Sequence, residues 1–250
     1  MDIQINDASV FRRSIDAIRD FLPQAQFRIS ADGLRISGMD SSHVGFVDYF
    51  LSAQDCKQLN VSHNSVIGIS MTTLSRVLAM AGIGTEGLTL TCGRDDSVLK
   101  VSFKTDGRSA NFELPTLDIH EDPIELPDLN YGAVVKAKTA DIAGMIKDLA
   151  IFGDSAMLCL DEEGFHVRVS GDTGKGELTL EPDDDREMLM EGDTVELSFG
   201  MKYLQQIVKS CSGLAAYMEV AFDPSNPLRV KTLFGKSSHF IAYLAPKVQE

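Results

Sequence analysis

The sequence predicts an α+β protein in which antiparallel sheet predominates and two similar domains each contain two helices. Three observations support this prediction. Short apolar or alternating runs of strand length recur along the chain, four segments have the spacing of amphipathic helices, and one pattern returns after about 130 residues. A length of 250 residues suits two domains of ordinary size.

An internal duplication is the strongest of these signals. Segment 8–34 resembles segment 139–165 at an offset of 131, and a second block repeats at an offset of 130. The matched pairs are Phe11–Ile142, Ile15–Ile146, Ile18–Leu149, Phe21–Phe152, Phe27–Leu158, Ile29–Leu160 and Gly33–Gly164, then Met71–Met201, Leu74–Leu204, Val77–Ile207, Leu78–Val208, Leu88–Met218 and Leu90–Val220. Two collinear blocks at nearly one offset favour duplication over a chance match of amphipathic helices.

The expected strands fall on both sides of a central linker. They cover residues 26–30, 34–38, 45–51, 66–70, 88–92, 98–104, 156–160, 165–170, 194–199, 217–222, 228–234 and 239–244. Pro123 and Pro127 disfavour both helix and central strand within residues 117–131, which predicts an extended linker between domains 1–116 and 132–250. The linker's apolar residues exceed what a solvated spacer needs, so it either hangs free or docks on a domain. They are Ile119, Ile124, Leu126 and Leu129.

Composition excludes several functional classes. The net charge of −14 repels nucleic acid at long range, which counts against a simple basic DNA-binding module. Any DNA role needs basic residues concentrated on one surface. No apolar run reaches the roughly 20 residues that span a bilayer, and the first residues do not resemble a secretory signal, which makes an intracellular location the default. The four cysteines are widely spaced, so we expect buried thiols rather than a zinc site or disulfides, and no cofactor.

Cations lie on the outer faces of all four expected helices. At about 100° per residue, one face of each helix is apolar. The inward residues are Phe11, Ile15, Ile18 and Leu22; Leu74, Val77, Leu78 and Ala81; Ile142, Met145, Ile146 and Leu149; and Leu204, Ile207, Val208 and Cys211. The cations outside these faces are Arg12, Arg13, Arg19, Arg76, Lys147, Lys202 and Lys209. One such cation is an ordinary solvated residue, but the set is notable because the acidic excess lies in the linker and in 181–193. The neighbouring Asp16, Asp20, Asp141 and Asp148 should keep phosphate binding weak.

Several motifs suggest chemistry that their context does not favour. The glycines of GIGTEG, Gly82, Gly84 and Gly87, follow a helix and precede a strand, whereas a dinucleotide site needs the reverse order. Asp40, Ser41, Ser42 and His43 are consecutive, so they cannot converge as a nucleophilic triad. A metal-dependent hydrolase using Asp183, Asp184 and Asp185 stays a weak alternative, because runs of like charge are usually solvated. The remaining histidines, His63, His120, His166 and His239, lack ligand spacing and are expected on the surface or in sheets.

Several separated motifs bring a family into view. Met39–Val44 reads MDSSHV, Pro227-Leu228 forms a turn, an acidic linker joins the halves, and Tyr243–Lys247 reads YLAPK. Together they cover nearly the whole chain and closely resemble the eukaryotic proliferating cell nuclear antigen family.

That resemblance implies a DNA-clamp fold with the two helices of each domain on one face, and six domains in a homotrimeric ring. The function implied is a non-enzymatic, nuclear DNA sliding clamp: a processivity factor for replicative polymerase and a docking platform for replication and repair proteins. Implied partners are encircled double-stranded DNA, the clamp loader, DNA polymerase and peptides carrying Gln with paired aromatics. A subunit of a heterotrimeric checkpoint clamp is the alternative with the same architecture.

The resemblance also assigns residues to three sites. The DNA-facing residues would be Arg12, Arg13, Arg19, Arg76, Lys147 and Lys209, with Lys202 and Arg108. The partner pocket would comprise Met39, His43, Val44, Phe46, Ile124, Leu126, Pro227, Tyr243, Leu244, Ala245 and Pro246. Ring closure would pair strand 108–114 with strand 174–180 of a neighbour, using Phe112, Arg108, Leu114, Lys175 and Leu178.

Three positions depart from the family pattern. Ala79 and Ile151 stand where further cations are expected, which implies a weaker grip on DNA. Glu162 stands where members of the family commonly carry a lysine that receives ubiquitin-like modifiers, which puts that signal in doubt.

Overall fold

The computed structural model describes residues 1–82, 84–93, 97–105, 107–122, 124, 129–192 and 194–247. The chain forms two compact units. The first comprises Met1–Ser41, Val47–Ile124 and Phe234–Phe240, and the second comprises Ser42–Phe46, Glu125–Leu233 and Ile241–Glu250. No described helix is long and apolar enough to cross a membrane.

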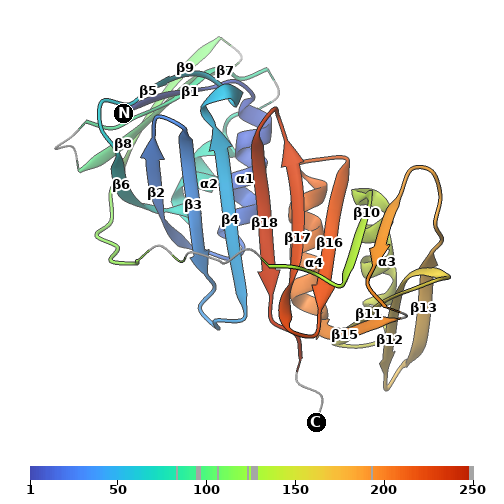
Figure 1. The fold of residues 1–250 in the computed structure, drawn as a ribbon. Helices are drawn as coiled ribbons and strands as arrows, with labels where there is room; N and C mark the ends of the chain where they lie inside the picture. Colours follow the sequence, from blue (N-terminus) through green and yellow to red (C-terminus); the bar gives the residue numbers. More distant parts are fainter. Residues whose placement is uncertain are drawn as a thin grey trace. The chain divides into compact units, whose positions relative to one another are not determined.

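The first unit contains two antiparallel sheets and two helices (Figure 1). Its elements are β1 (Asp2–Ile5), α1 (Ala8–Arg19), β2 (Gln24–Ser30), β3 (Gly33–Met39), β4 (Gly45–Ser52), a 3-10 turn (Ala53–Asp55), β5 (Cys56–Asn60), β6 (Ser65–Ser70), α2 (Met71–Leu78), β7 (Glu86–Thr91), β8 (Val98–Thr105) and β9 (Arg108–Pro115). One sheet has the order β5-β1-β7-β8-β9, and the other strands follow the order β4-β3-β2-β6.

The second unit repeats this plan with eleven further elements. They are β10 (Ala133–Lys138), α3 (Thr139–Leu149), β11 (Ser155–Asp161), β12 (Gly164–Gly171), β13 (Gly174–Leu180), β14 (Glu187–Met190), β15 (Val195–Gly200), α4 (Met201–Ser212), β16 (Tyr217–Asp223), β17 (Asn226–Phe234) and β18 (Ser238–Leu244). Strands β14-β10-β16-β17-β18 reproduce the order of the first sheet, and β13-β12-β11-β15 reproduce that of the second.

Hydrogen bonds and glycines confirm the predicted duplication. After the last strand of each unit the chain turns back to an edge strand: the Leu117 amide donates to Gly68 O, and the Lys247 amide donates to Ser198 O, both at 2.8 Å. Gly33 and Gly164 have φ of 152° and 140°, and a Cβ at either one would lie within 2.4 Å of a carbonyl oxygen. Only glycine fits both places, which explains why this pair matches in the sequence.

Each helix pair buries its apolar face against both sheets of its own unit. Helix α1 begins after Asp7, whose carboxylate caps the amides of Ser9 and Val10 at 2.9 Å. Helix α3 touches β10 and β16 of one sheet and β12 and β13 of the other. All sixteen residues predicted to face inward from the four helices are buried. Helical periodicity therefore predicted the core side of every helix correctly.

The sequence prediction missed several strands and placed the domain boundary more simply than the structure does. The unpredicted strands β1, β5, β10 and β14 have only four to six residues each, too few for a clear alternating pattern. Residues 234–240 group with the first unit because Asp55 holds their turn. Its carboxylate accepts the Lys236 and Ser237 amides and the Ser238 hydroxyl at 2.6, 3.0 and 2.7 Å. The boundaries 1–116, 117–131 and 132–250 stay a prediction.

Replacing Asp55 by alanine should lower the free energy of unfolding by about 1–3 kcal/mol, because three donors lose a charged acceptor. Desolvation raises the pKa of the Asp55 carboxyl, but hydrogen bonds from the Ser237 amide, the Ser238 hydroxyl and the Lys236 amide together outweigh it and hold that pKa below its ordinary 3.8. Its contribution is therefore present above that value and lost as pH falls through the lowered pKa. Urea unfolding from neutral pH down to about pH 3 should show the difference between variant and parent shrinking in acid. Asp32→Ala, an exposed acid with no side-chain hydrogen bond among the described residues, is the control; an equal loss there would contradict the assignment.

Candidate nucleic-acid and partner-binding sites

The three arginines of α1 differ in how free they are. No hydrogen bond or ion pair of Arg12 is found within the described part of the chain. Arg13 donates to Ser9 Oγ at 2.7 Å. Arg19 reaches across to α2, where it donates to Ser75 Oγ at 3.0 Å, and it also contacts Asp20 at 3.0 Å. Arg12 is therefore the most available cation of this helix, and Arg19 is partly committed to holding α1 against α2.

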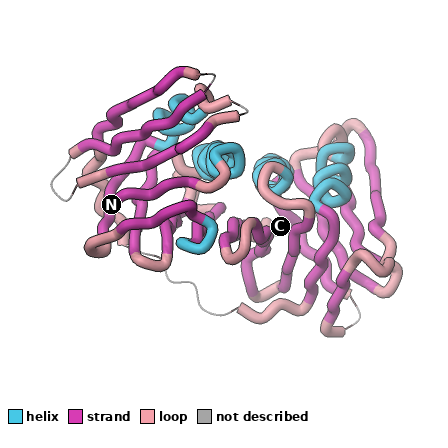
Figure 2. The backbone as a smooth tube through the Cα atoms, turned by 90° about the horizontal axis from the view of Figure 1, so that it is seen from above, coloured by secondary structure: helices cyan, strands magenta, loops and turns pink. Residues whose placement is uncertain are grey.

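The other helical cations point to solvent. Arg76 on α2, Lys147 on α3, and Lys202 and Lys209 on α4 are all exposed. Figure 2 shows that the two helices of each unit lie side by side, and contacts between α1 and α2 and between α3 and α4 agree. Arg108 is exposed too, but it begins strand β9 and so does not belong to the helical set. The sequence thus predicted the exposure of these cations correctly, while their role stays a prediction.

Three of the four acidic residues near these cations are engaged by the protein, and one of them is Asp20, which pairs with Arg19. Ser75 Oγ donates to Asp16 Oδ1 at 2.6 Å. Arg186 Nη2 lies 3.5 Å from Asp141 Oδ2. Their negative charge is therefore partly balanced within the protein. They reduce the positive charge of the helical surface less than the sequence suggested. Ala79 and Ile151 are exposed and add no charge, and Ile151 leaves 72% of its surface in solvent.

Much of the predicted partner pocket lies within the second unit. The Phe46 and Tyr243 rings stand 6.0 Å apart, and the Ala245 amide donates to Val44 O at 3.0 Å. His43 has φ of 55°, a left-handed conformation that costs energy for a residue with a Cβ. Strain of this kind concentrates at binding sites, so His43 is consistent with the predicted role of this loop.

Other predicted pocket residues fit less simply. Leu244 is 1% exposed and packs in the core, so its side chain can support the pocket from beneath but not touch a ligand in this conformation. Pro227 and Pro246 are half-buried, and Ala245 is exposed. Met39 and Ile124 are exposed residues of the first unit, at 36% and 45%. Leu126 lies outside the described residues.

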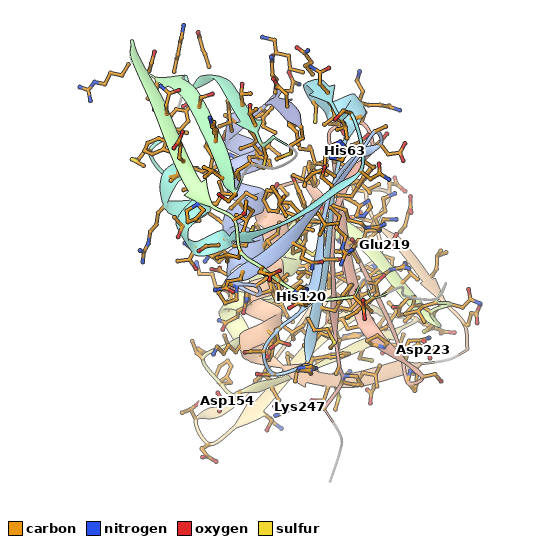
Figure 3. The ribbon with its side chains drawn as sticks, turned by 90° about the vertical axis from the view of Figure 1, so that its left-hand side faces the viewer. His63, His120, Asp154, Glu219, Asp223 and Lys247 are labelled. Atoms are coloured by element: carbon orange, nitrogen blue, oxygen red, sulfur yellow. The ribbon has the colours of Figure 1, made fainter. Side chains whose placement is uncertain are left out.

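Sequence reasoning missed a cluster around Tyr131. The Arg229 guanidinium carbon lies 4.7 Å from the centre of the Tyr131 ring, and Arg229 Nη2 donates to Glu219 Oε1 at 2.8 Å. Burial raises the pKa of Tyr131 to about 12. Arg229 follows Pro227 by two residues on β17, so strand alternation places both on one sheet face. That spacing was the available signal, and Figure 3 labels Glu219 and Asp223 on the neighbouring strand β16.

The two strands proposed for ring closure both end a sheet. β9 is the last strand of the first unit's five-stranded sheet, and β13 is the last of the second unit's four-stranded sheet. Phe112 stacks on Phe103 with centroids 5.9 Å apart and stays half-buried, and Leu178 is 37% exposed. Lys175 is exposed, whereas Leu114 is 7% exposed and turns into the core. The Leu114 backbone, not its side chain, is therefore what an approaching strand would meet.

The remaining motifs carry no visible chemistry. Asp185 accepts a hydrogen bond from Lys138 at 2.9 Å, and Arg186 pairs with Asp183 at 2.9 Å. Within the described ranges, no three His, Cys, Asp or Glu side chains gather as a metal site would require. His166 is buried in the sheet, with its ring nitrogens 2.8 Å from Asp161 Oδ1 and 2.9 Å from Thr179 Oγ1, an interaction that sequence spacing did not reveal. Glu162 is exposed in the turn between β11 and β12.

The two units share one topology, and each has cations on the solvent side of its helices, as expected for a duplicated clamp subunit. Comparison with known proteins supports this class. The model of the proliferating cell nuclear antigen N-terminal domain matches residues 1–123, and that of the C-terminal domain matches residues 125–248. The chain is 27% identical over 256 aligned positions to proliferating cell nuclear antigen of Chaetomium thermophilum, covering 99% of this chain and 98% of the relative. It is 26% identical over 260 positions to that of Dictyostelium discoideum, covering 99% of each.

The chain therefore belongs to the proliferating cell nuclear antigen family. It is a DNA sliding clamp that acts as a processivity factor in DNA replication and serves replication and repair proteins. The checkpoint-clamp alternative is not favoured by these matches.

The Tyr131 cluster generates a stability prediction. Replacing Arg229 by valine should lower the free energy of unfolding by about 1–2 kcal/mol, because Glu219 loses its partner and the ring loses its cation. Chemical unfolding measures this change. Leu233→Val, four residues along the same strand at a side chain that is 63% exposed, is the control and should have a smaller effect. An equal effect of both changes would show that the loss belongs to the strand and not to the cluster.

Proposed function

We propose that three copies of this chain close a ring around duplex DNA, with α1 to α4 of each copy lining the hole. The observation that carries the proposal is charge placement. Every helix presents a cation on its solvent side, although the chain as a whole carries a net charge of −14. Packing of the helices requires their apolar faces, whereas duplex DNA inside the ring would be attracted to the cations on the opposite faces.

Ring closure is proposed to occur by antiparallel pairing of β9 in one copy with β13 in the next. Both strands end their sheets, and an unpaired sheet edge invites association. The half-buried Phe112 on one edge and the exposed Leu178 on the other provide apolar surface for this contact. A head-to-tail contact of this kind generates a closed ring when its rotation suits three copies.

The contact with DNA is expected to be loose, as sliding requires. Arg19 is partly engaged by Ser75, and neither Ala79 nor Ile151 contributes charge. A few cations per copy neutralise few phosphates, so affinity from counterion release stays low and contacts exchange rapidly. Retention on DNA then depends on the closed ring and not on the strength of any one contact.

The pocket around Tyr243 is proposed to receive a short peptide carrying Gln and paired aromatic residues. Phe46 and Tyr243 offer aromatic surface, and Pro227 and Pro246 border it with rigid apolar rings. Buried aromatic anchors supply most of the binding energy in interfaces of this kind. Polymerase and clamp loader docked there would stay at high effective concentration near the primer end.

The chain itself is proposed to have no catalytic activity and to act in the nucleus. The acidic run that suggested a hydrolase is held by cations: Lys138 pairs with Asp185, and Arg186 pairs with Asp183. These carboxylates are thus occupied in structural ion pairs, which argues against their use as metal ligands. Chemistry on DNA belongs to the proteins that dock on the clamp.

Changing Arg12, Arg13 and Lys209 together to glutamate should reduce the clamp's retention on primed DNA by about tenfold at physiological salt, because three attractive contacts per copy become repulsive. Fluorescence measurement of loaded clamps reports retention. Native mass spectrometry should still show three times the chain mass. The matched control changes the exposed Lys57, Lys104 and Lys236, which lie outside the helices, to glutamate. If both triple variants lose retention equally, net charge and not the helical surface is responsible.

Tyr243→Ala should reduce stimulation of DNA synthesis by the cognate polymerase by about tenfold, as expected for loss of an aromatic hot spot. Ile124→Ala should have a smaller effect in the same direction. Primer-extension length in the presence of clamp and loader measures both. Tyr217→Ala is the control, since Tyr217 is exposed on β16 and is not assigned to the pocket. Undiminished stimulation by both variants would refute the pocket assignment.

A further inference from the structure

A cavity of about 200 Å³ lies at the start of helix α1, and the described residues that line it all belong to the first unit. Its floor is buried and largely apolar, since it includes Ile5, Phe11, Leu51 and Phe234, each at most 8% exposed. None of the lining residues is assigned above to DNA, to the peptide pocket or to ring closure. An apolar cavity of about 150 Å³ can hold benzene, so this one has room for a ring with a short substituent.

Tyr49 lines the same cavity and has a buried hydroxyl without a hydrogen bond among the described residues. Its side chain is wholly enclosed, and its ring stacks on Phe234 with centroids 5.8 Å apart. The nearby Ser14 hydroxyl donates to Val10 O at 3.0 Å. Burial raises the pKa of Tyr49, so this hydroxyl stays protonated and has a proton to donate. A buried donor without a partner costs free energy, which a ligand with an acceptor in the cavity would recover.

The rim of the cavity is acidic. Asp7 and Gly235 are exposed there, and Asp55 is half-buried. Asp7 Oδ1 accepts the Ser9 and Val10 amides at 2.9 Å, whereas Asp7 Oδ2 has no hydrogen bond or ion pair within the part of the chain that the structure describes. No lysine, arginine or histidine is found among the described lining residues. The rim therefore offers a carboxylate oxygen to a cation.

The turn at the rim has a fixed shape of its own. Gly235 has φ of 63°, and a Cβ there would stand 2.5 Å from the Asp55 carboxyl carbon. Both oxygens of Asp55 accept hydrogen bonds from residues 236–238, which hold this turn in place. A site that is formed in advance loses little conformational entropy on binding, so even a small ligand can bind it measurably.

We propose that this cavity binds a small aromatic amine whose ring carries a hydroxyl at the end opposite the ammonium. The ring occupies the apolar floor, the ring oxygen accepts a hydrogen bond from Tyr49, and the ammonium pairs with Asp7 Oδ2 at the rim. Ligand sites commonly combine an apolar lining with a few polar groups that fix orientation. Because the site lies within the first unit, its occupancy depends neither on ring closure nor on the peptide pocket.

Titration of the intact clamp with tyramine, followed by methyl NMR, tests the site. The methyl resonances of Ile5 and Leu51 should move with a dissociation constant on the order of 0.1–1 mM, as for a ligand of about ten non-hydrogen atoms. The methyl resonances of Ile207, which is buried on α4 of the second unit, should not move. Phenethylamine lacks the ring oxygen and 4-ethylphenol lacks the ammonium, so each should bind about fivefold to tenfold more weakly.

Two variants connect each end of the probe with one residue. Tyr49→Phe should weaken tyramine binding about fivefold and leave phenethylamine binding unchanged, because only tyramine has an oxygen for the hydroxyl. Asp7→Asn keeps a favourable helix cap but removes the charge, so it should weaken binding of both amines and not of 4-ethylphenol. Asp32→Asn makes the same change of charge at an exposed position outside the cavity and should alter none of the three dissociation constants.

Unmoved Ile5 and Leu51 resonances at millimolar tyramine would overturn the proposal. Equal movement of the Ile207 resonances would do the same, because binding would then be nonspecific. Equal affinity for the three probes, or tyramine binding unchanged by either Tyr49→Phe or Asp7→Asn, would also contradict it, since a proposed polar contact would not exist. The comparison of probes needs no variant, so it decides the question even if Tyr49→Phe fails to fold.

Discussion

The division of each helix into an apolar side and a cationic side is the constraint on which this molecule depends. Burying the apolar side against two sheets fixes each unit, since residues such as Ile15 and Ile207 are wholly enclosed. The same packing leaves Arg12 and Lys209 on the opposite side. Burial of the apolar faces is therefore enough to place the cations on the opposite faces. An acidic protein acquires a basic surface as a consequence of how its core packs.

Local sequence patterns predicted the regular parts of this fold because the forces behind them act over a few residues. Alternation revealed the longer strands, and a repeat near 130 residues revealed that the halves share one topology. Short strands such as β14 gave too few alternations to be seen. The placement of residues 234–240 depended on Asp55, which is about 180 positions away along the chain. Long-range hydrogen bonds of this kind have no signature in periodicity.

Sequence patterns also predicted some features of the candidate sites and missed those that depend on long-range contacts. Helical geometry predicted which cations are exposed. It did not predict that Arg19 is hydrogen-bonded to Ser75 and paired with Asp20. The family motif placed Leu244 in the pocket, whereas strand alternation sends its side chain into the core beside the outward Tyr243. The stacking of Arg229 on Tyr131 joins a strand to the end of the linker and became visible only in three dimensions.

Two hydrogen bonds bring the chain back to an edge strand, one from Leu117 to Gly68 and one from Lys247 to Ser198. Together they limit how the length of the chain between these residues can change. Each bond closes a stretch with the same separation of 49 positions. Net insertion or deletion inside either stretch must be absorbed by a turn, or the edge strand loses its cover and becomes open to aggregation. A substitution leaves this separation unchanged, so side chains inside either stretch can differ without moving the return segment from its edge strand.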